Sequence, residues 1–578
     1  MKKSLKLSLL LSWSSALSSR TNVHRPTSLA KIDPEKVRPF ASRQKTESMP
    51  WTQNIQAYGR FQESNEWASA YQSTHSLAVT EYFCENVEGT VPSDIRGDFF
   101  KAGPGNMERG GKRYRHVLDG DGFVAMFRFR DGLVSYTGRF VETEYYREEE
   151  AADSILYRNV FGTERCGAFL TKAFDLAIKN CANTNILKWG DRLFALWEGG
   201  RPYELDPNTL ETLSQKKCGP FRELGDQFCK IWGVTIDNGG LIDRRMHLGK
   251  FFTAHPHVVN NRLIAFRGAR NPLTNSVDME FCEFSPHWEE ISCSRITLRD
   301  CVASPHDFSV SETYYIFFEN RLKLDKLSFL MGLKSVSDAM KLQLDKPGYI
   351  HVVPRGHCSA KMQALKIELP VGYFNVHNIQ QVFQDGDVLT VYSNGWDLKD
   401  KRYFATRAEA VPFLGNWAGE YPSFRAGCVP PSLLYKTVVE LTSKRIISHE
   451  PLIPGLVMEF PITDDIEENT IYCASSSTDG TALPFSGIAK IVTARNHTSC
   501  PKVDFWWAES ATFTGETIPV VKRNGETGSW LLTLVYDTAN NRTSLVVFDS
   551  ENLSEGPICR IHLRHRLTMG LHSSFSAV

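Results

Sequence analysis

Short apolar and aromatic runs, separated by Gly, Asn and Asp, recur along this chain from about residue 50 onward. β-Branched and aromatic residues in runs this short favour strands over helices. Clear examples are residues 192–198, 314–318, 388–392, 530–536 and 544–548. The pattern therefore predicts a large all-β fold.

Two local units resemble each other. Residues 204–210 and 547–553 both lead from a strand into a turn that begins with Asp and ends with Leu. Such units at irregular intervals are typical of a β-propeller with divergent blades, although no fixed period is present.

The chain of 578 residues is long enough for several domains, but closed all-β folds also reach this length as one unit.

Charge and cysteine content argue against a nucleic-acid binder, a disulfide framework and a structural zinc site. Lys plus Arg and Asp plus Glu both number 66, so the net charge is zero, and we expect no nucleic-acid partner. The 13 cysteines are odd in number, irregularly spaced and contain no C-x-x-C pair. This argues against a disulfide framework and a structural zinc site, and indicates a compartment where thiols stay reduced.

Residues 1–48 are predicted to be a targeting leader and disordered linker. Lys2 and Lys3 precede an apolar run over residues 5–17, and a tract rich in Ser, Thr and Arg follows, with no acidic residue before Asp33. The run is too short to span a membrane. A signal-like segment followed by a transit-like one is typical of a bipartite plastid leader; another organelle or the cytoplasm is the alternative.

Residues 323–343 break the strand pattern. Their four lysines flank Leu327, Phe329, Leu330, Met331, Leu333, Val336 and Met340. Such an amphipathic stretch either lies at a membrane interface or packs as a helix or loop over a face of the fold. Periodicity leaves both alternatives open.

Four of the sixteen histidines stand at expected strand ends among apolar or small residues: His255, His306, His377 and His572. Imidazole is a common metal ligand, although one histidine beside a strand is ordinarily structural. The large, unequal separations exclude a local zinc motif. Ligands from four distant strands would require a closed architecture whose strands converge, such as the axis of a propeller.

Several motifs carry a resemblance to a known family. They are Gly-Asp-Phe-Phe-Lys-Ala-Gly-Pro-Gly at 97–105, Asp-Gly-Asp-Gly-Phe at 119–123, Ala-Asn-Thr-Asn at 182–185, Trp-Gly-Asp at 189–191 and Ala-Leu-Trp-Glu-Gly-Gly at 195–200. The chain resembles the carotenoid cleavage oxygenases, a superfamily that includes lignostilbene dioxygenases and the retinoid isomerase of the retinal epithelium. Its motifs are most similar to those of cyanobacterial-type apocarotenoid oxygenases. Residues 329–335 are similar to the membrane-facing patch of those enzymes, which implies peripheral membrane contact through 323–343.

The resemblance implies one domain over residues 49–578, a seven-bladed β-propeller with a helical and loop dome over the iron-bearing face. It makes His255, His306, His377 and His572 the ligands of one Fe(II), with two positions left for O₂ or water. It pairs Glu198 with His306, Glu459 with His377 and Glu516 with His572, each carboxylate accepting a hydrogen bond from the ring nitrogen that does not bind the metal.

Two details of the motifs need comment. The Ala-His-Pro pattern favours His255 as the ligand and His257 as a neighbouring structural residue. The chain departs from the family at Gln384, where an acidic residue is common.

By the same resemblance we expect an oxidoreductase, a non-haem Fe(II) dioxygenase that cleaves a conjugated double bond of a carotenoid or apocarotenoid with O₂ to give aldehyde or ketone products. Trp197 and Phe374 are candidate walls of an apolar tunnel for this polyene. The alternatives are a stilbene-type phenolic dioxygenase with a Tyr–Lys pair near the iron, a polyene isomerase, or an inactive carotenoid-binding propeller. Neither the double bond cleaved nor the oligomeric state follows from the sequence.

Overall fold

The structure is a computed structural model. It describes residues 69–165, 178–213, 250–271, 274–356, 363–369, 372–400, 404, 430–464, 467, 469–477, 485–493, 501–509 and 511–578. All of them belong to the larger of two compact units, Gln53–Val578, and the predicted leader lies outside the described residues.

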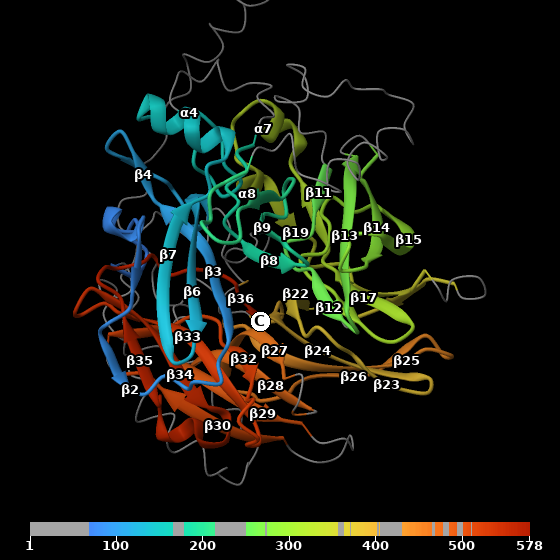
Figure 1. The fold of residues 1–578 in the computed structure, drawn as a ribbon. Helices are drawn as coiled ribbons and strands as arrows, with labels where there is room; N and C mark the ends of the chain where they lie inside the picture. Colours follow the sequence, from blue (N-terminus) through green and yellow to red (C-terminus); the bar gives the residue numbers. More distant parts are fainter. Residues whose placement is uncertain are drawn as a thin grey trace, which may run out of the picture. The chain divides into compact units, whose positions relative to one another are not determined.

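Seven antiparallel sheets of three or more strands form the blades of a β-propeller, which confirms the predicted fold class (Figure 1). The first blade orders β1 (Glu81–Phe83), β7 (Leu133–Phe140), β6 (Asp121–Arg130), β3 (Gly97–Asn106) and β36 (Ser573–Ala577). The second orders β10 (Tyr203–Leu205), β9 (Arg192–Leu196) and β8 (Asn185–Trp189). The third orders β11 (Lys250–Phe252), β13 (Arg262–Asn271), β14 (Ser276–Phe284) and β15 (Glu290–Arg299), with β12 (His257–Val259) also paired to β13.

The remaining four blades follow in chain order. The fourth orders β16 (Ser309–Val310), β17 (Tyr314–Glu319), β20 (Tyr349–Pro354) and β21 (Leu365–Glu368). The fifth orders β22 (Tyr373–Asn378), β24 (Val388–Asp397), β25 (Leu433–Glu440) and β26 (Arg445–Pro451), with β23 (Phe383–Asp385) on β24. The sixth orders β27 (Leu456–Thr463), β28 (Thr470–Ser477), β29 (Gly487–Val492) and β30 (Lys502–Trp507). The seventh orders β2 (Val87–Gly89), β35 (Cys559–His562), β34 (Arg542–Asp549), β33 (Ser529–Asp537) and β31 (Thr512–Thr514), with β32 (Ile518–Val521) on β33.

Both ends of the unit close the ring. Strand β36 from the C-terminus pairs with β3 of the first blade, and β2 from the N-terminal side pairs with β35 of the seventh. Figure 1 shows β36, β22, β27 and β32 around the same central point, where the C-terminus also lies. A closed ring leaves no exposed edge at the seam.

Apolar clusters between neighbouring blades form the core. One cluster joins Tyr315 and Phe317 of the fourth blade to Phe266 and Phe281 of the third, and another joins Ile316 and other fourth-blade residues to the fifth blade. All six residues of β17 are buried, because both faces of the sheet are covered. A strand in this setting reads as a continuous apolar run without polar alternation.

Within the part of the chain that the structure describes, three short α-helices lie on one side of the blades (Figure 1): α4 (Glu144–Ala152), α7 (Lys326–Leu330) and α8 (Val336–Ala339). Thr143 caps α4 by accepting a hydrogen bond from the Tyr146 amide, and Asp153 ends it in the left-handed conformation. Two-stranded sheets accompany them, β4 (Glu108–Arg109) with β5 (Lys112–Arg113), and β18 (Leu322–Leu324) with β19 (Met340–Leu342).

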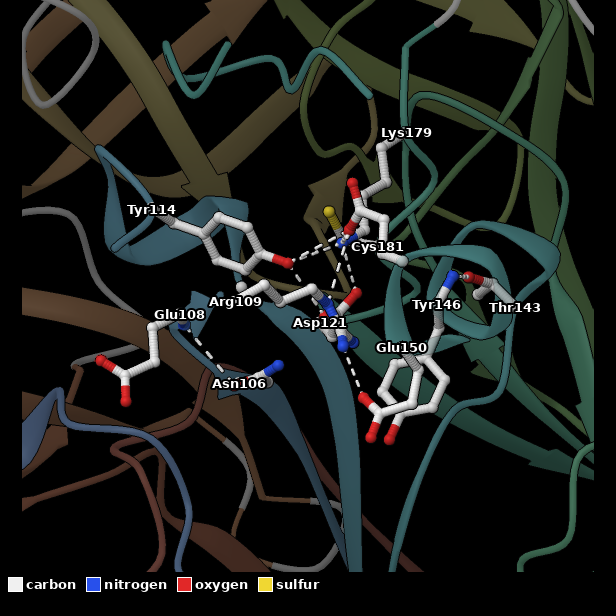
Figure 2. A network of polar contacts seen from close by, with 12 residues as sticks. Asn106, Glu108, Arg109, Tyr114, Asp121, Thr143, Tyr146, Glu150, Lys179 and Cys181 are labelled. Atoms are coloured by element: carbon white, nitrogen blue, oxygen red, sulfur yellow. Dashed lines mark hydrogen bonds and ion pairs between the residues drawn. The ribbon is translucent and has the colours of Figure 1, made fainter. Parts of the chain in front are cut away.

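A buried ionic network fastens α4 to the first blade (Figure 2). The Arg109 guanidinium lies 2.9 Å from Asp121 and 2.5 Å from Glu150 of α4. The Lys179 ammonium lies 2.5 Å from Asp121 and 2.6 Å from Glu149, also of α4. Glu150 is exposed, and burying the other four charges is tolerable only because each has opposite partners within hydrogen-bond reach.

The segment 323–343 folds into β18, α7, α8 and β19 and packs against the region around residues 115–158. The Arg158 guanidinium lies 5.1 Å from the centre of the Phe329 ring, and Asp338 forms an ion pair with Arg115 at 2.7 Å. Leu327 and Leu333 nevertheless remain 72% and 60% exposed. No helix among the described residues is long and apolar enough to cross a membrane.

Candidate metal centre

The seven predicted site residues come from seven different blades. The second blade supplies Glu198 after β9, the third His255 after β11, the fourth His306 before β16, the fifth His377 in β22, the sixth Glu459 in β27, the seventh Glu516 between β31 and β32, and the first His572 before β36. Glu198 follows the middle strand of its sheet, and each of the other six residues stands on or next to an end strand. The ring of blades therefore brings together residues that are far apart in the sequence, the first and last of which, Glu198 and His572, are separated by about 370 positions.

The four imidazoles converge through one ring nitrogen. Nε2 of His306 lies 3.1 Å from Nε2 of His255 and 3.2 Å from Nε2 of His377. The His572 ring centre lies 4.6 Å from that of His255 and 5.2 Å from that of His377. Potential donor atoms of His255, His377 and His572 all lie within 4.8 Å of one another.

Three of the rings bind a carboxylate through the other nitrogen. His306 Nδ1 donates to Glu198 at 2.6 Å, His377 Nδ1 donates to Glu459 at 3.0 Å, and His572 Nδ1 donates to Glu516 at 3.0 Å. These are the partners that the resemblance implies. Since a carboxylate only accepts, each Nδ1 carries the proton, and in the neutral ring Nε2 presents a lone pair.

This arrangement fits a bound cation. His306 and His377 both have this tautomer when neutral, so their Nε2 lone pairs would face each other across 3.2 Å, which is repulsive without a positive charge between them. Two imidazole–metal bonds of about 2.1 Å at a right angle place their nitrogens about 3 Å apart. An all-imidazole donor set suits iron, copper, nickel or zinc.

The electrostatics keep Glu198 and Glu516 ionised. Burial alone would raise the pKa of Glu198, but the His306 imidazole, with help from Arg270, holds it below its ordinary value. In Glu516 burial is likewise outweighed by His572 and Lys101, so its pKa is also lowered. Burial and the neighbouring histidines hold the pKa of His255 well below 6.5, which favours the neutral ring that a metal requires.

Asp307, whose role the sequence left unexplained, ties three site segments together. Its carboxylate accepts the amide of Phe308 at 2.7 Å and the amide of Asn378 at 2.9 Å, and lies 3.4 Å from His257 Nε2. His257 Nε2 donates to the Phe308 carbonyl at 2.7 Å. Asp307 thus links the chain next to His306 with the chain next to His377, and His257 serves this linkage.

Asn394 is a functional residue that sequence reasoning missed. Its Oδ1 accepts the His377 amide at 2.8 Å, while its Nδ2 donates to Glu459 and, at 2.9 Å, to Ser432. It therefore positions both members of one histidine–carboxylate pair. The run Ser-Asn-Gly at 393–395 suggests a turn after the strand predicted over 388–392, whereas β24 continues to Asp397. The only signal for Asn394 would have been a polar residue inside a strand, and the turn-like Ser-Asn-Gly run conceals that the strand continues.

Two cations lie behind the site, Lys101 buried and Arg270 half-buried. Arg270 donates to Ser304 at 2.7 Å and faces the Glu198 charge. Lys101 donates to the Leu571 carbonyl at 2.5 Å, next to His572, and faces the Glu516 charge. Each offsets one carboxylate.

The remaining candidates have different surroundings. Trp197 is buried beneath Gly199 and Gly200, and Phe374 packs on Trp396 with ring centres 5.2 Å apart. Gln384 lies on the exposed strand β23, where it accepts a hydrogen bond from Thr313 at 3.0 Å. None of the contacts described for Gln384 joins it to the four imidazoles.

A further aromatic side chain, Phe460, contacts the imidazoles directly. Its ring lies 5.4 Å from that of His377 and 5.0 Å from that of His572. Its φ of +53°, within the bulge of β27, is unusual for a bulky residue. The bulge lets consecutive residues Glu459 and Phe460 both serve the site.

The site is open on one side. The side chains of His306 and Glu198 keep 31% and 38% of their exposure, against 10% for His377 and 8% for His572. A ligand would therefore approach past His306 and Glu198.

Comparisons with known proteins agree with the family resemblance of the sequence motifs and with the propeller fold. The model of the family described as retinal pigment epithelial membrane protein matches residues 73–577. The chain is 28% identical over 525 residues to the apocarotenoid-15,15'-oxygenase of Synechocystis, covering 88% of this chain and 96% of that protein. It is 26% identical over 543 residues to the chloroplastic carotenoid cleavage dioxygenase 7 of Oryza sativa subsp. japonica, covering 84% and 86%. The crystal structure of the cobalt-substituted Synechocystis apocarotenoid oxygenase superposes with a TM-score of 0.73 at 25% identity, covering 89% of this chain and 99% of that one. This chain therefore belongs to the retinal pigment epithelial membrane protein family, the carotenoid oxygenases.

Proposed function

We propose that this chain is a non-haem Fe(II) dioxygenase that cleaves a conjugated double bond of a carotenoid or apocarotenoid with O₂, giving aldehyde or ketone products. The observation that carries the proposal is the convergence of four imidazole rings, three of which are fixed by a carboxylate on Nδ1. His255, His306, His377 and His572 would hold one iron ion. Similarity to two oxygenases of carotenoid or apocarotenoid substrates supports the substrate class.

When bound, iron would supply the means to activate O₂ beside a polyene. The chain's own residues do the rest. The neutral imidazoles leave the full divalent charge on the metal. Glu198, Glu459 and Glu516 partly offset this charge, because each is hydrogen-bonded to Nδ1 of a ligand imidazole. Because each of the seven residues is anchored in a separate packed blade, the site has little freedom to rearrange. Phe460 provides an apolar surface directly beside His377 and His572.

The test is to purify the protein without O₂, quantify iron, and incubate it with an apocarotenal under air. We expect one iron per chain, loss of visible absorbance, and two carbonyl products by mass. Stoichiometric iron without cleavage of any polyene would overturn the proposal. His306→Ala should lose iron and turnover together, whereas His287→Ala, on an exposed turn, should retain both.

A phenolic stilbene is a weaker candidate substrate. It would call for a tyrosine and a lysine free to bind a phenol. Among the described residues, one buried tyrosine–lysine pair is hydrogen-bonded, with Lys179 Nζ 3.0 Å from the Tyr114 hydroxyl. Its ammonium is already held by Asp121 and Glu149. Incubation with a hydroxystilbene under the same conditions should give no products.

We further propose that segment 323–343 contacts a membrane surface. Exposed Leu327 and Leu333 support this, and α7 has no buried residue. Leu327→Ser/Leu333→Ser should reduce co-sedimentation with liposomes several-fold, while Leu133→Ser, 65% exposed on β7, should not. Equal binding by all three proteins would contradict the proposal.

Residues 1–48 are proposed to direct the chain to plastids, in keeping with the chloroplastic relative from rice. A fluorescent protein fused after residue 48 should enter plastids, and its accumulation in another compartment would contradict this assignment.

A further inference from the structure

Two cysteines face each other across the third blade. Cys282 of β14 and Cys293 of β15 are direct partners in the antiparallel register, and their Sγ atoms lie 3.0 Å apart. Both are free thiols. Directly opposed residues of an antiparallel pair have Cα atoms about 4.5–5.5 Å apart, a separation that a disulfide spans without backbone movement.

The surroundings of the pair disfavour a metal ion. Glu280 is close enough to complete a three-ligand cluster, since its oxygens and the two sulfurs lie within 4.8 Å of one another. However, one Glu280 oxygen accepts from Arg267 at 2.8 Å and the other accepts from Arg295 at 2.5 Å. The carboxylate is therefore already used, and two guanidinium groups would repel a cation.

Access to the two sulfurs is unequal. Cys282 is buried among apolar residues of the second and third blades, whereas Cys293 on the outer strand β15 is only partly buried. A small oxidant from solvent therefore reaches Cys293 first. The Cys282 sulfur lies deeper in the blade, in contact with the Cys293 sulfur. This is the arrangement of an attacking thiol with a resolving partner.

We propose that Cys282 and Cys293 form a redox-modification site, a dithiol that hydrogen peroxide or a comparable small peroxide converts into an intramolecular disulfide. The Cys293 thiolate attacks one peroxide oxygen, the O–O bond breaks, and Cys293 becomes a sulfenic acid while the departing hydroxide takes a proton and leaves as water. The Cys282 sulfur then attacks the Cys293 sulfur, the S–O bond breaks, and the released hydroxide and thiol proton leave as a second water. Two electrons pass from the thiols to the peroxide.

The bond would stiffen the blade that carries His255. The cluster containing Cys282 also contains Ala254, next to His255, and Leu196, two residues before Glu198. The disulfide would join strands β14 and β15 on either side of the short connection after Phe284, so that the hairpin cannot separate without reduction. This property is independent of the reaction proposed for the metal centre.

The experiment is site-resolved thiol mapping of the full chain, reduced with dithiothreitol and then exposed to hydrogen peroxide. Remaining thiols are alkylated and the protein is digested without reductant. We expect a linked pair of peptides containing Cys282 and Cys293, lighter than the sum of the two by two hydrogen atoms, which returns to separate peptides with dithiothreitol. Cys293→Ser should abolish the link, and Cys301→Ser, a buried cysteine elsewhere, should leave it unchanged.

Three results would overturn the proposal. The first is alkylation of both cysteines after peroxide treatment that oxidises other thiols. The second is conversion of Cys293 to a sulfinic acid while Cys282 stays a free thiol. The third is zinc retained by the purified chain and lost in Cys293→Ser, which would make the pair a metal site. Peptide mapping of the unsubstituted protein decides among these outcomes even if a variant folds poorly.

Discussion

Asp307 shows how much of the site depends on one carboxylate that contacts no reacting group. In Asp307→Asn, one of the two oxygens becomes an NH₂ that must face the amide of either Phe308 or Asn378, so donor meets donor. We expect metal affinity to fall about 10- to 100-fold, as for other residues that orient ligands. Competition with a chelator measures this. Asp385→Asn, on the exposed β23, is the matched control, and equal affinity in both variants would contradict the role given to Asp307.

A second residue, His565, makes stability depend on pH away from the metal centre. It lies against Tyr136, with its Nε2 3.1 Å from the Tyr82 hydroxyl, and burial lowers its pKa from 6.5 to about 4. The unfolded chain therefore binds a proton before the folded one does, so stability is complete above pH 6.5 and is lost as pH falls toward 4. The loss amounts to about 3 kcal/mol at most.

The measurement for His565 is the urea midpoint at several pH values between 7 and 4. His565→Phe keeps an aromatic ring without the titration, so its midpoint should fall less over this range than that of the unsubstituted protein. Other histidines contribute to both curves equally. Parallel curves would contradict the prediction.

At this scale the sequence alone could show which residue types were available but not which of them meet. His255, His306, His377 and His572 were identifiable by their strand-end settings, and the family motifs were needed to pair them with glutamates. Asp307 and Asn394 could not be predicted, because their partners lie in other blades or in a strand that extends further than its apolar run. Contacts set by the closing of a ring leave no local trace in the sequence.

At the scale of elements, the buried network between α4 and the first blade carries a clear stability prediction. Lys179→Met removes the cation between Asp121 and Glu149 and leaves their charges partly uncompensated at a fully buried position. Breaking such a network from one side costs about 3–5 kcal/mol. Urea unfolding should show this loss. Arg96→Ala, which breaks a solvent-exposed ion pair with Asp131, should change stability by about 0.5 kcal/mol or less. Equal effects would contradict the account.

Elements were the most predictable level of this molecule. The runs at 192–198, 314–318, 388–392, 530–536 and 544–548 correspond to β9, β17, β24, β33 and β34, which confirms the strand assignments. Their apolar side chains are buried between blades and so leave a continuous signal. The division of segment 323–343 into α7 and α8 was not predictable, since each is only about one turn long and is held by contacts with Arg115 and Arg158.

For the whole molecule, the last strand is the test of how ring closure and the metal centre depend on each other. Deleting residues 573–578 keeps His572 but removes β36, and with it the pairing to β3 and the Ser573 amide that Glu516 accepts. Without β36 the first blade loses its axial strand, and the His572 ring loses the backbone that aims it. We expect the truncated chain to bind no stoichiometric iron and to unfold with a lower urea midpoint and a broader transition. Deleting only Val578, which is 73% exposed, should preserve both properties. A truncated chain with full iron content would mean that the centre forms without β36, and that closure by β36 serves stability alone.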